Sequence, residues 1–160
     1  IALLVDRSGS MGGKPLATSA MAAAAVAWRS PEDYSVIAFG KDVVVAKGQT
    51  STKSGEQVVN DVLSLRGFGT TDLAGALLAA GDQLSRTRAG RRITVILSDC
   101  RATVEGDVQA AARALDEVVI LAPSGDDAEA RVLASQVGAR IACIDGPSDI
   151  PSALQTVLGD

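Results

Sequence analysis

Small oxygen-bearing side chains stand at alternate positions directly after the first apolar run of the chain. Asp6, Ser8 and Ser10 are interleaved with and followed by glycines, which let the backbone turn tightly enough for these side chains to converge. A second acidic residue, Asp99, follows a later apolar run, and Thr71 lies in a glycine-rich turn before a helical pattern. Carboxylates and hydroxyls without nitrogen or sulfur donors suit a hard cation such as Mg²⁺, Mn²⁺ or Ca²⁺ and disfavour zinc. The sequence therefore offers these residues as candidate metal ligands.

The residue counts exclude several classes of function. The chain has no histidine, which excludes hydrolysis by a serine or cysteine with an imidazole base, His-ligated zinc sites and histidine pH switches. The net charge is −4 and Lys and Arg form no long block, so we expect no nucleic-acid partner. The longest apolar run, residues 20–28, is far shorter than the roughly 20 residues of a membrane-spanning helix, so we expect no membrane partner.

Length and composition predict one globular domain over residues 1–160. With 160 residues, 47% of them apolar and 21% charged, the chain can bury one core. Two cysteines, Cys100 and Cys143, are too few for a disulfide framework and favour a reducing, cytoplasmic setting. The chain begins inside an apolar run at Ile1, without Met or a signal peptide, so we expect it to be a piece of a longer protein.

Short apolar runs alternate with helical patterns along the chain. Continuous apolar runs are typical of strands buried on both faces of a parallel sheet, and they fall at 1–5, 36–39, 93–97, 118–122 and 141–144. Helical patterns fall at 15–29, 73–84, 108–115, 132–137 and 150–158. The run 43–46 follows a strand after only 40–42, a link that allows a hairpin but no parallel crossover. We therefore predict an α/β, three-layer Rossmann-like fold with a mostly parallel six-stranded sheet, one antiparallel edge strand and helices on both faces.

Several neighbouring residues receive structural roles in this interpretation. Either Thr71 or Asp72 is placed to cap the helix 73–84. For Asp72 we prefer the capping role to a role as metal ligand. Thr70 and Ser98 are expected to be turn residues that hold the ligands in place. Among the aromatic residues, Trp28, Tyr34 and Phe39 are expected in the core. Three basic residues near the site are expected to be solvated surface charge, with contact to an acidic partner as the alternative: Arg7, Lys14 and Arg101.

The separated pieces together resemble a known family. Three motifs carry the resemblance: Asp-x-Ser-x-Ser at residues 6–10, Gly-x-Thr-Asp-Leu at residues 69–73 and an Asp that closes an apolar strand. With these motifs the chain resembles a von Willebrand factor type A domain over essentially its whole length. The resemblance implies a metal-ion-dependent adhesion site in which one divalent cation is surrounded by Asp6, Ser8, Ser10, Thr71 and Asp99. Thr71 is preferred over Thr70 because it directly precedes the Asp-Leu of the motif. The chain departs from the family at Cys100, where a glycine is usual.

The resemblance also implies the function of a binding module without catalytic activity. In that family the bound metal keeps one position open, and an Asp or Glu of a protein partner fills it. The chain resembles intracellular bacterial members of the family that accompany MoxR-type or chelatase-type AAA+ ATPases. This resemblance rests on the sequence Asp-Arg-Ser-Gly-Ser-Met at residues 6–11 and on an Ala-rich composition with Arg in place of Lys. The implied partner is such an ATPase or its substrate.

A different class of function uses the same carboxylates. In a Mg²⁺-dependent phosphatase or phosphotransferase, Asp6 would be the covalent nucleophile and Asp99 a metal ligand. Such enzymes need a second carboxylate two residues after the nucleophile as acid and base, and this chain has Ser8 there. The binding module is therefore the preferred hypothesis and the enzyme the alternative.

Overall fold

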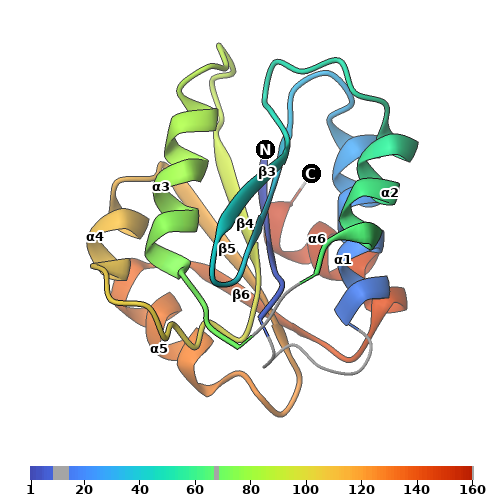
Figure 1. Cartoon of the computed structure of the whole chain (residues 1–160). Coiled ribbons are helices and arrows are strands. Elements are labelled where there is room, and N and C mark those ends of the chain that lie inside the picture. Colours follow the sequence, from blue (N-terminus) through green and yellow to red (C-terminus); the bar gives the residue numbers. More distant parts are fainter. Residues whose placement is uncertain (9–14, 67–68, 160) are drawn as a thin grey trace.

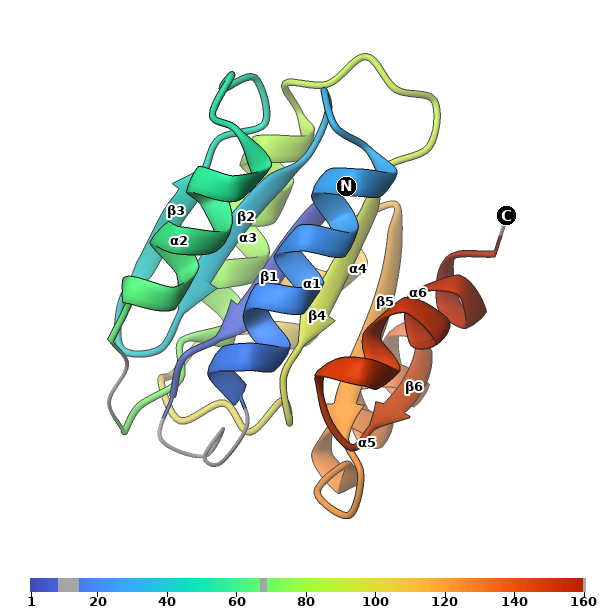
Figure 2. The same cartoon turned by 90° about the vertical axis from the view of Figure 1, so that its right-hand side faces the viewer.

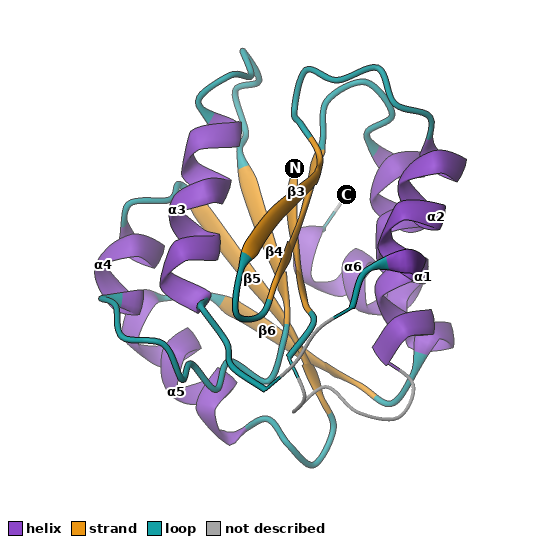
Figure 3. Cartoon of the chain, in the orientation of Figure 1, coloured by secondary structure: helices purple, strands orange, loops and turns teal. Residues whose placement is uncertain are grey.

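The computed structural model describes residues 1–8, 15–66 and 69–159 and forms one sheet with helices on both faces (Figures 1 and 3). In chain order the elements are β1 (Ala2–Asp6), α1 (Pro15–Arg29), β2 (Ser35–Phe39), β3 (Val43–Lys47), α2 (Gly55–Ser64), α3 (Leu73–Leu84), β4 (Ile93–Leu97), α4 (Val108–Arg113), β5 (Glu117–Pro123), α5 (Ala128–Val137), β6 (Arg140–Ile144), the 3₁₀ turn η1 (Pro147–Asp149) and α6 (Ile150–Leu158). The predicted α/β three-layer fold is confirmed.

The strand order determines where a ligand can bind. The six strands lie in the order β3-β2-β1-β4-β5-β6. All neighbours are parallel except β2 and β3, which pair antiparallel as the short link between them predicts. From β1 the chain first builds the sheet toward β3, and then returns to add β4 on the other side of β1. The strand order therefore reverses between β1 and β4, and open α/β sheets bind ligands outside the carboxyl ends of the strands at such a point.

Two apolar cores cover the two faces of the sheet. Residues of α1, α2 and α6 pack with Leu3 and Val5 on one face, which Figure 2 turns toward the viewer. Residues of α3, α4 and α5 pack with Ala2 and Leu4 on the other. Successive side chains of a strand point to opposite faces, so Asp6 continues the series of Ala2 and Leu4 and faces the α3 side. Burial on both faces explains why the strands are continuously apolar.

Several helix ends follow the expected capping chemistry, but α5 and α6 begin without a side-chain cap bond. The Asp72 side chain accepts a hydrogen bond from the backbone N–H of Gly75 at 2.9 Å, so Asp72 and not Thr71 caps α3. Gly138, at φ 70°, ends α5 in the left-handed conformation that favours glycine. Asp127 precedes α5 but makes no side-chain cap bond, because its carboxylate binds the Arg131 guanidinium instead.

The helix α1 shows one wrong prediction from the sequence. Tyr34 and Phe39 are buried as expected, but the Trp28 side chain is 87% exposed. Trp28 lies about 200° around the helix from the buried Val26 and therefore faces solvent. In an Ala-rich helix the apolar pattern does not mark one face, so it could not reveal this. With 15 residues α1 is too short to span a bilayer, and no other described helix is long and apolar enough.

The contrast between these aromatic residues gives a stability prediction. Replacing the buried Phe39 with Ala removes core contacts and should lower the free energy of unfolding by about 3–5 kcal/mol. Trp28→Ala, the matched variant at an exposed position, should change it by less than about 0.5 kcal/mol. Urea unfolding followed by circular dichroism measures both values. A cost for Trp28→Ala comparable to that of Phe39→Ala would contradict the exposed position of Trp28.

Candidate metal centre

Asp6 is held from two sides where β1 ends. The register that pairs Val5 with Leu97 makes Asp6 and Ser98 the next facing residues of the two parallel strands. The Ser98 Oγ donates a hydrogen bond to Asp6 Oδ2 at 2.5 Å, and the Ser8 backbone N–H donates to Asp6 Oδ1 at 2.8 Å. Asp6 has no exposed surface. Its carboxylate is therefore buried and fixed in orientation.

Asp99 lies directly after β4 and is also fully buried. Its Oδ1 accepts a hydrogen bond from the Arg101 backbone N–H at 3.0 Å. Its Oδ2 is buried and has no hydrogen-bond partner among the residues that the structure describes. A buried carboxylate oxygen without a donor is energetically costly, and a bound cation is one way to compensate it.

The two carboxylates also act on each other electrostatically. Burial raises the pKa of the Asp6 carboxyl, hydrogen bonds from Ser8 and Ser98 oppose that rise, and the negative charge of Asp99 adds to it. Two acidic groups that repel each other in a buried site favour the binding of a positive ion between them. The residues present therefore fit a divalent cation.

Thr71 reaches the same edge of the sheet from the start of α3. It is 1% exposed. Its backbone N–H donates to the Thr103 Oγ1 at 2.7 Å, and its carbonyl accepts from the N–H groups of Thr103 and Val104 at 3.1 and 3.2 Å. Thr103 follows Asp99 in the loop after β4, so this loop ties Thr71 to the end of β4. No spacing in the sequence reveals this link, because it joins residues 32 positions apart.

The structure thus brings most of the predicted ligands to one edge. Asp6, Ser8, Thr71 and Asp99 are all buried at the carboxyl ends of the strands, while Ser10 lies outside the described residues. Within the described ranges no three His, Cys, Asp or Glu residues form a metal-binding group. The assignment of the five ligands stays a prediction.

Cys100 has an unusual backbone conformation beside the site. Its φ of 61° lies in the left-handed region, and among the described residues other than glycine it alone has a positive φ. This conformation directs the Cys100 N–H to the Ser98 Oγ at 2.9 Å. Burial, followed by the charges of Asp99 and Asp6, raises the pKa of the Cys100 thiol to about 12. The left-handed conformation explains why a glycine suits this position, and Cys100 adopts it under strain.

Of the basic residues near the site, Arg101 is an exposed surface charge as expected, whereas Arg7 differs from that expectation. Arg101 forms an ion pair with Asp126, so it already has an acidic partner within the chain. Arg7 is only partly exposed, and its Nη2 donates to the Leu65 carbonyl oxygen. Lys14 lies outside the described residues.

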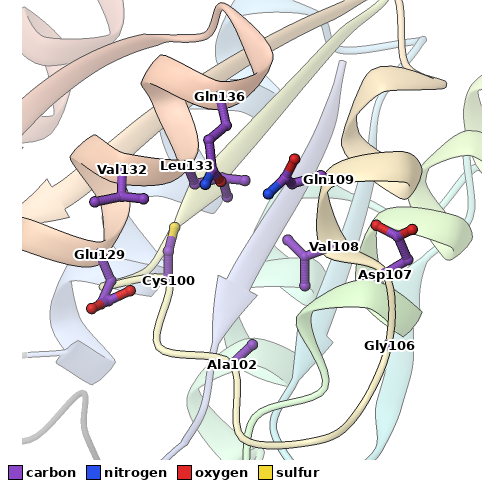
Figure 4. Close-up of a pocket in the computed structure, with 10 residues that line it drawn as sticks. All are labelled: Cys100, Ala102, Gly106, Asp107, Val108, Gln109, Glu129, Val132, Leu133 and Gln136. Carbon is purple, nitrogen blue, oxygen red and sulfur yellow. The ribbon is translucent and has the colours of Figure 1, made fainter.

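A groove between α4 and α5 opens next to Cys100. It encloses about 600 Å³, and its walls include Val108 of α4 and Leu133 of α5. Figure 4 shows the Cys100 side chain directed toward α5 and Leu133, with the acidic Asp107 and Glu129 at the sides of the groove. The groove has no basic lining residue, so it is unsuited to an acidic ligand.

Comparison with protein families supports the same interpretation of the motif. A sequence model of the von Willebrand factor type A domain matches residues 1–102 of the chain. These residues include every predicted ligand, from Asp6 to Asp99. No curated protein sequence matches the chain significantly.

Solved structures share the fold at low sequence identity. A von Willebrand factor type A protein from Catenulispora acidiphila superimposes with a TM-score of 0.77 and 16% identity, covering 97% of this chain and 40% of that one. The manganese-loaded TRAP protein of Plasmodium vivax gives a TM-score of 0.74 and 14% identity, covering 98% of this chain and 72% of that one. Proximal thread matrix protein 1 of the mussel byssus, with a zinc-occupied MIDAS motif, gives 0.75 and 14%, covering 98% and 46%. The chain spans less than half the length of the first structures that it matches.

The backbone of Cys100 gives a test of this local geometry. Cys100→Gly should be more stable than Cys100→Ala by about 1 kcal/mol, because only glycine adopts the left-handed conformation without strain. In the interior of α5 the order should be normal, with Ala134→Gly costing about 1 kcal/mol. Urea unfolding of the three variants measures these differences. If the glycine variant at position 100 is the less stable of the two, the left-handed conformation is wrong.

Proposed function

Because the chain belongs to the von Willebrand factor type A domain family, we propose that it is a divalent-cation-dependent protein-interaction module. The proposed ligands of the cation are Asp6, Ser8, Ser10, Thr71 and Asp99. Mg²⁺ is the proposed ion, with Mn²⁺ or Ca²⁺ as substitutes, since these ions prefer oxygen ligands. When bound, the ion would supply an electrophilic position for one more anionic oxygen, from an Asp or Glu side chain of a partner protein.

One observation carries this proposal. Asp99 Oδ2 is buried without a hydrogen-bond partner among the described residues, and the buried carboxylate of Asp6 acts on the same region. Hydrogen bonds to Ser8 and Ser98 compensate Asp6, but nothing in the described chain compensates Asp99 Oδ2. A cation at the ends of β1 and β4 would satisfy that oxygen and neutralise both charges.

The enzymatic alternative receives no support from the geometry. Both carboxylate oxygens of Asp6 accept hydrogen bonds from neighbouring residues, which reduces their nucleophilicity. Ser8 occupies the position where a phosphotransferase needs an acid and base, and a hydroxyl cannot fill that role. We therefore propose binding without bond cleavage.

The finer parts of the proposal concern the partner and the setting. We propose a bacterial, cytoplasmic protein whose partner is an AAA+ ATPase or the substrate of one. The sequence of residues 6–11 supports this association, and the two free cysteines, Cys100 and Cys143, support a reducing compartment. We also propose that residues 1–160 form one domain, because all described strands join one sheet.

Metal binding should appear as a gain in thermal stability. A cation that binds only the folded state stabilises it by about 2.7 kcal/mol at about 100 times its dissociation constant. For a domain of this size each kcal/mol corresponds to roughly 2–4 °C in Tm. Differential scanning calorimetry with and without MgCl₂ measures the shift. Asp99→Asn and Thr71→Val should both abolish it.

Two comparisons make this measurement decisive. Without metal, Asp99→Asn should be at least as stable as the natural chain, because it removes a buried charge whose Oδ2 lacks a donor. The control Asp82→Asn changes an exposed carboxylate on α3 and should keep the full Mg²⁺ shift. An unchanged Mg²⁺ shift in Asp99→Asn would exclude Asp99 as a ligand.

The interaction itself should depend on the same groups. Affinity capture with the immobilised domain should retain a partner in MgCl₂ and release it in EDTA, because the partner carboxylate then loses its position. Thr71→Ala should retain no partner under either condition, while Asp82→Asn should behave like the natural chain. A partner retained equally in MgCl₂ and EDTA would show recognition that does not use metal.

A further inference from the structure

A second cavity lies beside the metal site at the same edge of the sheet. It encloses about 150 Å³ between the end of β1, the turn from β2 to β3 and the segment after α2. Its polar lining side chains are Arg7, Lys41, Arg66 and one acid, Asp42. No carboxylate among the described residues lies within ion-pair distance of the three basic groups. With three basic side chains and one acid, the cavity carries a net positive charge.

Arg7 is held in place at the wall of this cavity. Its Nη2 donates to the Leu65 carbonyl oxygen at 2.5 Å, which fixes the guanidinium in place. Its Nε is buried and has no hydrogen-bond partner within the described ranges. Burial lowers the pKa of Arg7, and the neighbouring charge of Arg66 lowers it further. Two guanidinium groups held close together favour an anion between them.

The cavity shares a wall with the metal site. The Arg7 N–H donates to the Phe39 carbonyl at 2.6 Å, and the Asp72 N–H donates to the Gly40 carbonyl at 2.7 Å. The turn at Gly40 is thus tied both to the residue after Asp6 and to the residue after Thr71. The cavity therefore adjoins the proposed metal site through this turn. The negative charge of Asp6 acts on Arg7. A cation bound to Asp6 would offset that charge, so the electrostatic potential in the cavity would become more positive.

We propose that this basic cavity, formed by Arg7, Lys41 and Arg66, binds a second acidic side chain of the same partner segment. The inference rests on the proposed function, since the first carboxylate of the segment binds the metal. The partner is then a protein with two acidic residues close in sequence. Charge complementarity selects this partner, because the cavity is lined by three basic side chains and one acid. Asp42 weakens the preference by placing a negative charge at the same cavity.

Synthetic peptides test the proposal directly. The probes are blocked Gly-Ser peptides with one Asp, and a series with a second Asp placed one to four residues away. In saturating MgCl₂, one spacing should bind about tenfold more tightly than the single-Asp peptide, the gain from one further charge-assisted contact. Isothermal titration calorimetry measures the affinities.

Variants of the cavity residues test where the additional affinity of the two-Asp peptide arises. The double variant Lys41→Ala with Arg66→Ala should bind the best two-Asp peptide no more tightly than it binds the single-Asp peptide. Its Mg²⁺-dependent Tm shift should persist. Asp42→Asn should increase the gain. The control Arg88→Ala removes an exposed arginine from the loop before β4 and should leave the gain intact.

Each outcome separates the inference from the function on which it rests. If the single-Asp peptide binds in a Mg²⁺-dependent way but no two-Asp peptide binds more tightly, the second subsite is overturned and the metal site is kept. A gain that persists in the double variant places the contact elsewhere and also overturns the inference. Absence of Mg²⁺-dependent binding for every peptide, together with no Tm shift, overturns both proposals.

Discussion

Two buried carboxylates at the ends of β1 and β4 set the electrostatic constraint on this edge of the sheet. Asp6 and Asp99 both lie without exposed surface where the two strands end. Burying one charge is costly, and burying two of the same sign is more so. The sheet places them together because β1 and β4 are neighbours at the point where the strand order reverses. The cation that we propose would compensate both charges.

The surrounding residues keep this arrangement in place by backbone contacts. Ser98 links Asp6 to the N–H of Cys100, and that link exists because Cys100 takes the left-handed conformation. On the other side, Thr103 holds the backbone of Thr71. The strained backbone of Cys100 and the hydrogen bonds made by the hydroxyls of Ser98 and Thr103 therefore fix these residues in place. A site prepared in this way loses less conformational entropy when a ligand binds.

The sequence predicted those parts that depend on local pattern. Continuous apolar runs indicated buried parallel strands, and the short 40–42 link indicated the antiparallel pairing of β2 and β3. The ends of β1 and β4 could be placed together because parallel strands present their carboxyl ends at one edge. Contacts between distant residues could not be predicted. The bond from Arg7 to Leu65 joins positions 58 apart, and it changes Arg7 from a surface charge into part of a cavity.

The exposed position of Trp28 affects how this protein can be studied. Trp28 is the only tryptophan in the chain, and its indole is 87% exposed in the folded state. An indole surrounded by water before and after unfolding changes its emission little, so intrinsic fluorescence is a poor monitor of folding here. Trp28 also lines an apolar hollow, together with Ala24 of its own helix and Val59 of α2. Its emission is therefore a sensitive reporter of any macromolecule that covers the α1 and α2 surface, without an added dye.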